Sequence, residues 1–67
     1  MSRIQLSTFL SDDMDLKAIV YLDTDKKVYE VDYAKNGLIV TTESYADKSL
    51  QYHEDAAENY VMGIKKI

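Results

Sequence analysis

The sequence contains no cysteine, which excludes a disulfide framework, a thiolate zinc site and a cysteine nucleophile. It has no proline, so no proline-rich linker divides it, and its only glycines are Gly37 and Gly63, too few for a glycine-rich phosphate-binding loop. No apolar run is long enough for a signal peptide or a membrane-spanning helix, so the predicted location is the cytoplasm.

The length and composition predict one small globular domain over residues 1–67. The chain has 67 residues, of which 46% are hydrophobic and 30% are charged, a balance too apolar for a disordered chain and too polar for a membrane protein. Twelve acidic and eight basic side chains give a net charge of −4, which repels nucleic-acid phosphates. A core of this size without covalent links must hold by packing alone or by association with another chain.

Three segments between residues 17 and 44 have the character of β-strands. Residues 18–22 form a short apolar run rich in strand formers, residues 28–33 alternate with a period of two, and residues 38–43 return after Asn36-Gly37, a strong hairpin signal. In the second segment Tyr29, Val31 and Tyr33 share one face, and the intervening residues share the other. These features predict an antiparallel meander over residues 17–44.

The register of the last hairpin has two readings. A two-residue turn places Tyr33 opposite Val40 and Glu30 opposite Glu43, whereas a three-residue loop with a bulge places Tyr33 opposite Ile39. Opposed like charges destabilise a sheet, which favours the second reading slightly. The sequence leaves both open.

Residues 47–63 have the pattern of one amphipathic helix. Asp47 or Ser49 can cap its start, and Gly63 can cap its end because glycine adopts the left-handed conformation at little cost. Lys65 and Lys66 then suit the negative end of the helix dipole. One side of this helix is predicted to be buried and consists of Leu50, His53, Ala57, Tyr60, Val61 and Ile64.

The N-terminal segment, residues 1–15, is predicted to be a strand or a packed segment. Ile4 and Leu6 alternate with polar residues, which favours a strand, while Phe9-Leu10 before a polar turn also suits a packed loop. The predicted fold class is therefore α+β, a three- or four-stranded antiparallel β-meander with one C-terminal amphipathic helix packed on one face.

A single helix covers only one face of such a sheet. If Ala18 and Val20 face the helix, Ile19, Tyr21 and Val28 lie on the other face, which is too apolar to be left in water. Either residues 1–15 fold over that face or a second protein chain covers it, as in a homodimer. The candidate protein-contact residues on this face are Ile19, Tyr21 and Val28.

Six tyrosines are many for a chain of this length. Tyrosine is enriched at protein interfaces because it combines an apolar ring with a polar tip, although ordinary half-buried packing explains most single tyrosines. Tyr52 lies just off the apolar side of the predicted helix, and it and Tyr45, which precedes the helix, are the further candidate contact residues. Sheet tyrosines can also stack unpaired bases, but here acids lie nearby in sequence and no arginine accompanies them.

No catalytic, cofactor or metal site is predicted. His53, the only histidine, lies on the apolar side of the helix, where a packed residue is the more common role than a base or a ligand. The acidic stretches 12–15 and 23–25 resemble fragments of cation sites but lack the glycine and the distal glutamate of a calcium loop, so solvated turns are the favoured reading. We expect no enzymatic activity.

Residues 49–64, which follow the meander, resemble the C-terminal part of small uncharacterised proteins of marine cyanobacterial phages. The resemblance implies expression in the cytoplasm of an infected bacterium, where many such proteins bind a host or phage protein. It carries no functional residues over to this chain.

The predicted function is a small acidic protein-binding module without catalysis, a phage accessory protein that binds a bacterial host factor and self-associates through the uncovered sheet face or an edge strand. The alternative is a nucleic-acid-directed protein, either a single-strand binder that uses its tyrosines or an acidic mimic of nucleic acid. A mimic requires the acidic side chains to converge on one face.

Overall fold

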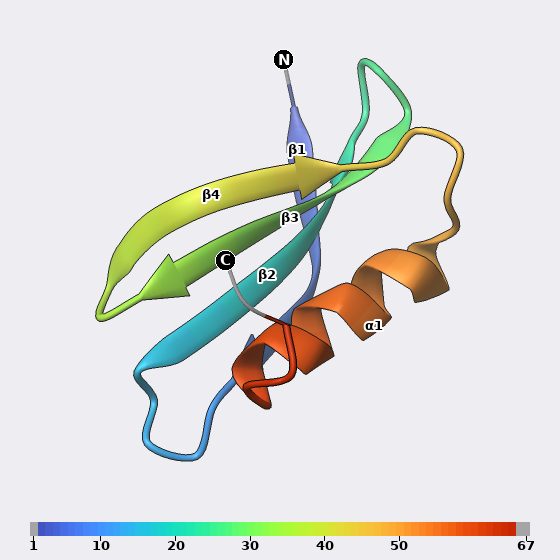
Figure 1. Ribbon diagram of the computed structural model, residues 1–67. Helices are drawn as coiled ribbons and strands as arrows, with labels where there is room; N and C mark the ends of the chain where they lie inside the picture. Colours follow the sequence, from blue (N-terminus) through green and yellow to red (C-terminus); the bar gives the residue numbers. More distant parts are fainter. Residues whose placement is uncertain (1, 66–67) are drawn as a thin grey trace.

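The computed structural model describes residues 2–65 as a four-stranded antiparallel sheet with one helix against it (Figure 1). Strands β1 (Arg3–Leu10), β2 (Leu16–Asp23), β3 (Val28–Lys35) and β4 (Leu38–Ser44) are neighbours in chain order, and helix α1 (Leu50–Val61) follows them. The predicted α+β meander is confirmed. Its strand count is four, because the N-terminal segment forms β1. The helix is shorter than the predicted range 47–63 at both ends.

The core lies between α1 and the centre of the sheet. Antiparallel pairing places Ala18 opposite Tyr33 and Val20 opposite Val31, so these side chains project together toward the helix. The buried cluster consists of Ala18, Val20, Val31, Tyr33, Ala57 and Tyr60. The alternation read from residues 28–33 is therefore confirmed, and the hydrophobic effect accounts for which face the helix covers.

The β3–β4 hairpin closes with a two-residue turn. Asn36 and Gly37 both have positive φ, 53° and 85°, and Lys35 pairs with Leu38 across them. Two consecutive positive φ values belong to the turn whose twist matches the right-handed twist of the flanking strands. The two-residue reading of this turn is correct.

Beyond the turn, the register of β4 differs from both readings. A bulge leaves Val40 as an extra residue, so Tyr33 lies opposite Thr41 and Glu30 lies opposite Ser44. Neither predicted partner of Tyr33 is right. The bulge shifts the strand by one residue and so avoids the pairing of two glutamates that an unbroken ladder would impose.

Both ends of α1 are capped by local hydrogen bonds. The Ser49 side chain accepts from a backbone N–H of the first turn. At the other end, Gly63 has φ 83°, its N–H donates to the Tyr60 carbonyl at 3.1 Å, and the Ile64 N–H donates to the Asn59 carbonyl at 2.9 Å. This pair of bonds is the Schellman motif, so the predicted glycine cap is confirmed.

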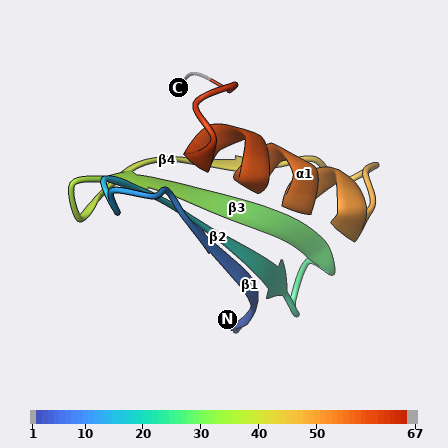
Figure 2. The ribbon, with the colours of Figure 1, turned by 90° about the horizontal axis from the view of Figure 1, so that it is seen from below.

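The helix covers only part of the sheet. It packs mainly on β2 and also contacts β3 and β1, while β4 extends beyond it (Figure 1). Seen from below, α1 lies on one side of the sheet and no described segment forms a layer on the other side (Figure 2). Within residues 2–65 the sheet therefore has one open face, and β1 and β4 are its edges.

Candidate protein-contact surfaces

The open sheet face carries Ile19, Tyr21 and Val28, as predicted, and all three are half-buried. The N-terminal segment does not fold over them as a layer. It pairs edge-on with β2, and Phe9 packs against the core on the helix side, so only the Arg3 side chain reaches over this face. Of the two alternatives, a layer formed by the N-terminal segment is therefore not found in the described residues, because the backbone of this segment has its hydrogen-bond partners in the sheet.

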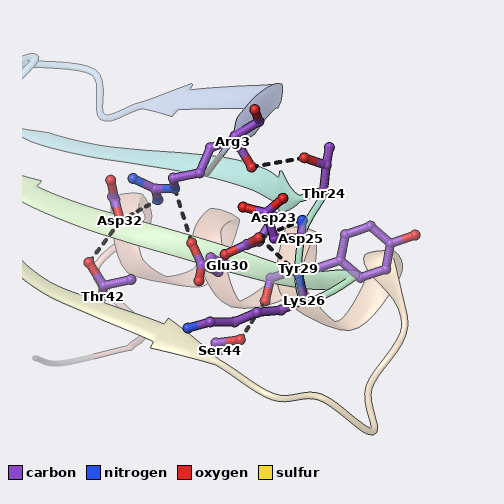
Figure 3. Close-up of polar contacts among 11 residues, drawn as sticks. Arg3, Asp23, Thr24, Asp25, Lys26, Tyr29, Glu30, Asp32, Thr42 and Ser44 are labelled. Atoms are coloured by element: carbon purple, nitrogen blue, oxygen red, sulfur yellow. Dashed lines mark hydrogen bonds and ion pairs between the residues drawn. The ribbon is translucent and has the colours of Figure 1, made fainter.

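A polar network crosses the open face (Figure 3). The guanidinium of Arg3 lies over the Tyr21 ring, 3.8 Å from its centre. It also contacts Glu30, with Nε 3.0 Å from Oε1, and Asp32, with Nη2 2.9 Å from Oδ1. The same oxygen of Asp32 accepts a hydrogen bond from the Thr42 hydroxyl at 2.8 Å. One chain of contacts thus links all four strands.

This network makes the centre of the face more polar than the sequence indicated. Burial of Arg3 opposes its charge, but the hydrogen bond to Asp32 and the charges of Asp32 and Glu30 outweigh it and raise the pKa of Arg3 above its usual value. The expectation that no arginine accompanies these acids is wrong. Arg3 is far from them in sequence, and only the pairing of β1 with β2 brings it near.

The strand tyrosines do not form a base-stacking platform on this face. Tyr21 is the only strand tyrosine there, since Tyr29 and Tyr33 lie opposite residues that face the helix. The Tyr21 ring is covered by Arg3, which is itself paired with two carboxylates. A single-strand binder that uses its tyrosine face gains no support from this arrangement.

Tyr45 and Tyr52, the other predicted contact residues, lie together beside the start of α1. Their rings meet edge to face with centres 5.5 Å apart. Tyr52 is 44% exposed, whereas Tyr45 is half-buried. The Lys48 ammonium lies 5.3 Å from the centre of the Tyr52 ring. Spacing along the chain did not indicate this contact, which depends on how the β4–α1 connection turns.

His53 holds that connection in place. It is fully buried, its Nδ1 lies 2.8 Å from the Ser49 carbonyl oxygen, and its Nε2 accepts a hydrogen bond from the Tyr45 N–H at 3.2 Å. These two contacts require a proton on Nδ1 and a lone pair on Nε2, which defines one neutral tautomer. The Tyr29 ring packs against the His53 ring, with the ring centres 5.7 Å apart. The interpretation of His53 as a packed residue is confirmed.

Glu43 joins β4 to the C-terminal tail. Its Oε1 accepts a hydrogen bond from the Tyr33 hydroxyl at 2.8 Å and lies 3.4 Å from the Lys65 ammonium. The ammonium also lies 5.9 Å from the centre of the Tyr33 ring. The predicted second tail lysine, Lys66, lies outside the described residues.

The same carboxylate affects two phenols. Burial raises the pKa of Tyr33 far above its usual value, and the hydrogen bond to Glu43 adds to this shift. Burial and the negative charge of Glu43 also raise the pKa of Tyr45. A shallow hollow of about 300 Å³ lies nearby and is lined by Tyr52, Asp55, Ala56, Asn59 and Lys65.

The acidic turns are closed by their own carboxylates. Asp23 Oδ1 accepts from the backbone N–H groups of Asp25 at 2.9 Å and Lys26 at 3.1 Å (Figure 3). Asp13 Oδ1 likewise accepts from the Ser11 hydroxyl and the Asp15 N–H. These are side-chain mimics of a backbone turn. In the described part of the chain no group of three or more histidine or carboxylate side chains is placed to hold a metal ion.

Acidic side chains do not converge on one surface. They are distributed over both acidic turns, the open face, β4, the β4–α1 connection and the helix: Asp12, Asp13, Asp15, Asp23, Asp25, Glu30, Asp32, Glu43, Asp47, Glu54, Asp55 and Glu58. Several are engaged within the molecule, as Glu54 is by the Ser7 hydroxyl at 2.7 Å. The convergence that a nucleic-acid mimic requires is therefore not found.

The two sheet edges differ in character. Edge strand β4 begins with three consecutive exposed apolar side chains, Leu38 at 73%, Ile39 at 57% and Val40 at 52%. It contains no lysine, arginine or proline, the residues that commonly protect an edge from further pairing. Edge strand β1 also exposes apolar residues, but polar residues separate most of them and Arg3 begins the strand. The sequence does not single out residues 38–40, because it leaves open which strands lie at the edges of the sheet.

Compared with protein-family models, curated proteins and solved structures, the chain matches none of them. The only helix within residues 2–65 is α1, and it is too short to cross a membrane. The function is therefore inferred from the surfaces of the molecule itself.

Proposed function

We propose that this chain is a protein-binding module without a catalytic centre, and that it binds an extended segment of a partner polypeptide along the free edge of β4. The observation that carries the proposal is the exposed apolar run Leu38–Ile39–Val40 on an edge strand that has no lysine, arginine or proline and whose one charged side chain, Glu43, lies toward its other end. An edge strand offers main-chain donors and acceptors to an added strand, and neighbouring side chains provide its specificity.

The open face supports binding less well than this edge. Its centre holds the network of Arg3 with Glu30 and Asp32, and covering that network would remove charged groups from water. Self-association through the open face, one of the two predicted modes, is therefore the second candidate. Pairing of β4 with β4 of a second copy uses the same edge and is an outcome that the test below detects.

The test uses a blocked heptapeptide of alternating threonine and valine with lysine at its centre. Strand addition is expected to slow the amide exchange of β4 and to shift the amide resonances of β4, because main-chain hydrogen bonds form along that edge. Ile39→Lys should weaken binding several-fold by placing a charge on the edge. The matched control is Ile4→Lys, at an exposed position on the opposite edge, and it should bind as the wild type does.

Light scattering after size exclusion, over a range of protein concentrations, shows whether the β4 edge binds a partner peptide or a second copy of the chain. A monomer that takes up the peptide supports the proposal as stated. If the protein is a dimer and Ile39→Lys abolishes the dimer, the β4 edge is still the binding site, but the partner is a second copy of the chain. A dimer that only Tyr21→Glu abolishes, with native circular dichroism, would overturn the β4 proposal in favour of the open face.

A further inference from the structure

We infer that Glu43 and the tyrosines around it form a recognition site for a basic side chain of the bound segment, and that Lys65 of the chain's own tail occupies this site in the free protein. The inference rests on the proposed function, because it names the chemistry of the segment that pairs with β4. That segment carries a lysine or an arginine.

The tail lysine makes the contacts that a partner's ammonium would make. Its Nζ lies 3.4 Å from Glu43 Oε1 and 5.9 Å from the centre of the Tyr33 ring, which combines an ion pair with a cation–π contact. The side chains of Lys65 and Glu43 are only 29% and 24% exposed, so solvent screens this pair less than a fully exposed one. The Tyr33 hydroxyl donates to the same carboxylate oxygen and orients it.

The position of Glu43 links this site to the free edge. It lies on β4 opposite Val31, which faces the helix, so its side chain projects to the helix side of the sheet, on the strand that α1 contacts least. An added strand would present alternate side chains on that same side. A basic residue paired with Glu43 across the new ladder, or diagonal to it, would reach the carboxylate, and opposite charges across strands stabilise pairing.

The tail can be displaced at small cost. Lys65 follows the helix cap at Gly63, and its N–H donates to the Asn59 carbonyl at 3.0 Å, a contact that does not depend on its side chain. Near it, Ile64 is exposed and contributes little burial. One partly exposed ion pair and the Tyr33 ring hold the Lys65 side chain, so an incoming basic side chain that also packs on Tyr45 and Tyr52 competes with it. The net charge of −4 also favours a basic partner.

The site can be tested apart from the edge by using the n-butylammonium ion, which reproduces the end of a lysine side chain, with 1-butanol as the uncharged control. Ring resonances of Tyr33 and Tyr45 report binding in NMR titrations. Because Lys65 competes from the same chain for the carboxylate of Glu43, Lys65→Ala should bind n-butylammonium about three-fold more tightly than the wild type, the factor for a tail pair that is formed about two-thirds of the time. The control Lys17→Ala, at an exposed position of β2 away from Glu43, keeps the tail lysine and should bind as the wild type does.

Binding of n-butylammonium is expected to require the carboxylate of Glu43. The double variant Lys65→Ala, Glu43→Gln should show no saturable ring shifts with n-butylammonium, while circular dichroism remains native. If Lys65→Ala and the double variant bind n-butylammonium equally well, Glu43 does not form the site and the inference is overturned. The inference is also overturned if Lys65→Ala does not bind the ion at all.

A second experiment compares the heptapeptide with one in which norleucine replaces the central lysine. On Lys65→Ala, the lysine peptide should bind about two- to five-fold more tightly, the range for a cross-strand charge pair with an aromatic contact. If both peptides bind equally and Ile39→Lys weakens both, the recognition site is overturned and β4 binding stands. If neither peptide binds, both proposals are overturned.

Discussion

The guanidinium carbon of Arg3 lies 3.8 Å from the centre of the Tyr21 ring, and through this contact the edge strand β1 reaches across β2 to the carboxylates of β3. One side chain therefore ties three strands together on the face that has no covering layer. A polar network stabilises the open face of the sheet, whereas a hydrophobic core stabilises the face that packs against α1.

We expect Arg3→Met to destabilise the protein by about 1 kcal/mol, because it removes charge-assisted hydrogen bonds and a cation–π contact that are partly exposed to solvent. Urea unfolding followed by circular dichroism measures the loss. Lys17→Met, at an exposed position of β2, is the control and should change stability less. Equal losses for the two variants would show that the network contributes nothing beyond a surface charge.

His53→Ala should cost about 3 kcal/mol, since it leaves a cavity in a fully buried position and removes the acceptor of the Tyr45 N–H. The contact between Tyr45 and Tyr52 should loosen with it, which NMR of the ring resonances detects. Gln51→Ala, on the exposed side of α1, is the control. A His53→Ala protein of unchanged stability and unchanged ring shifts would contradict the anchoring role.

Stability should fall in acid partly through Asp23. The backbone N–H of Lys26, helped by that of Asp25, holds the pKa of the Asp23 carboxyl below its usual value. Because the folded pKa is the lower one, this stabilisation is fully present above the unfolded pKa of about 4 and is lost as pH falls through the folded pKa. Urea unfolding at pH values from about 2 to 6 measures the slope.

Asp23→Asn should reduce that slope, since the amide oxygen still accepts the two hydrogen bonds but does not titrate. The matched control is Asp12→Asn, which lies in the other acidic turn and leaves the contacts of Asp23 intact. An unchanged slope in Asp23→Asn would mean that other carboxylates produce the acid sensitivity.

Gly63→Ala should destabilise the protein by about 1 kcal/mol through the backbone alone. The residue has φ 83°, and a Cβ there would meet no atom within 4 Å, so steric overlap with neighbours is absent. Gly63→Asn should cost less, because asparagine tolerates the left-handed conformation better than alanine. Thermal unfolding distinguishes the two, and equal losses would exclude this explanation.

Local sequence signals predicted the elements that local physics governs. The alternation of residues 28–33, the pair Asn36-Gly37, the cap at Ser49 and the cap at Gly63 each depend on residues within a few positions of one another. The absence of catalysis, the cytoplasmic location, the phage resemblance and the nature of the partner stay predictions.

The candidate surfaces were predicted only in part. Ile19, Tyr21 and Val28 were placed on the open face by strand alternation, which is a local property. That Tyr45 contacts Tyr52, and that Arg3 covers Tyr21, depend on loop geometry and strand pairing between distant residues. The alternation along one strand carries no information about which strand lies beside it.

By itself, the sequence determined three of the four strands, the helix, its glycine cap and the alternation of strand faces, because backbone conformation and hydrophobic periodicity act over a few residues. Only the tertiary structure decided the bulge at Val40, the network of Arg3, the contact of Lys65 with Glu43 and which apolar residues remain exposed on β4. The contacts of Arg3 and Lys65 depend on segments far apart in the chain, and the bulge and the exposed residues of β4 depend on the strand register, which the hydrophobic pattern of one strand does not fix.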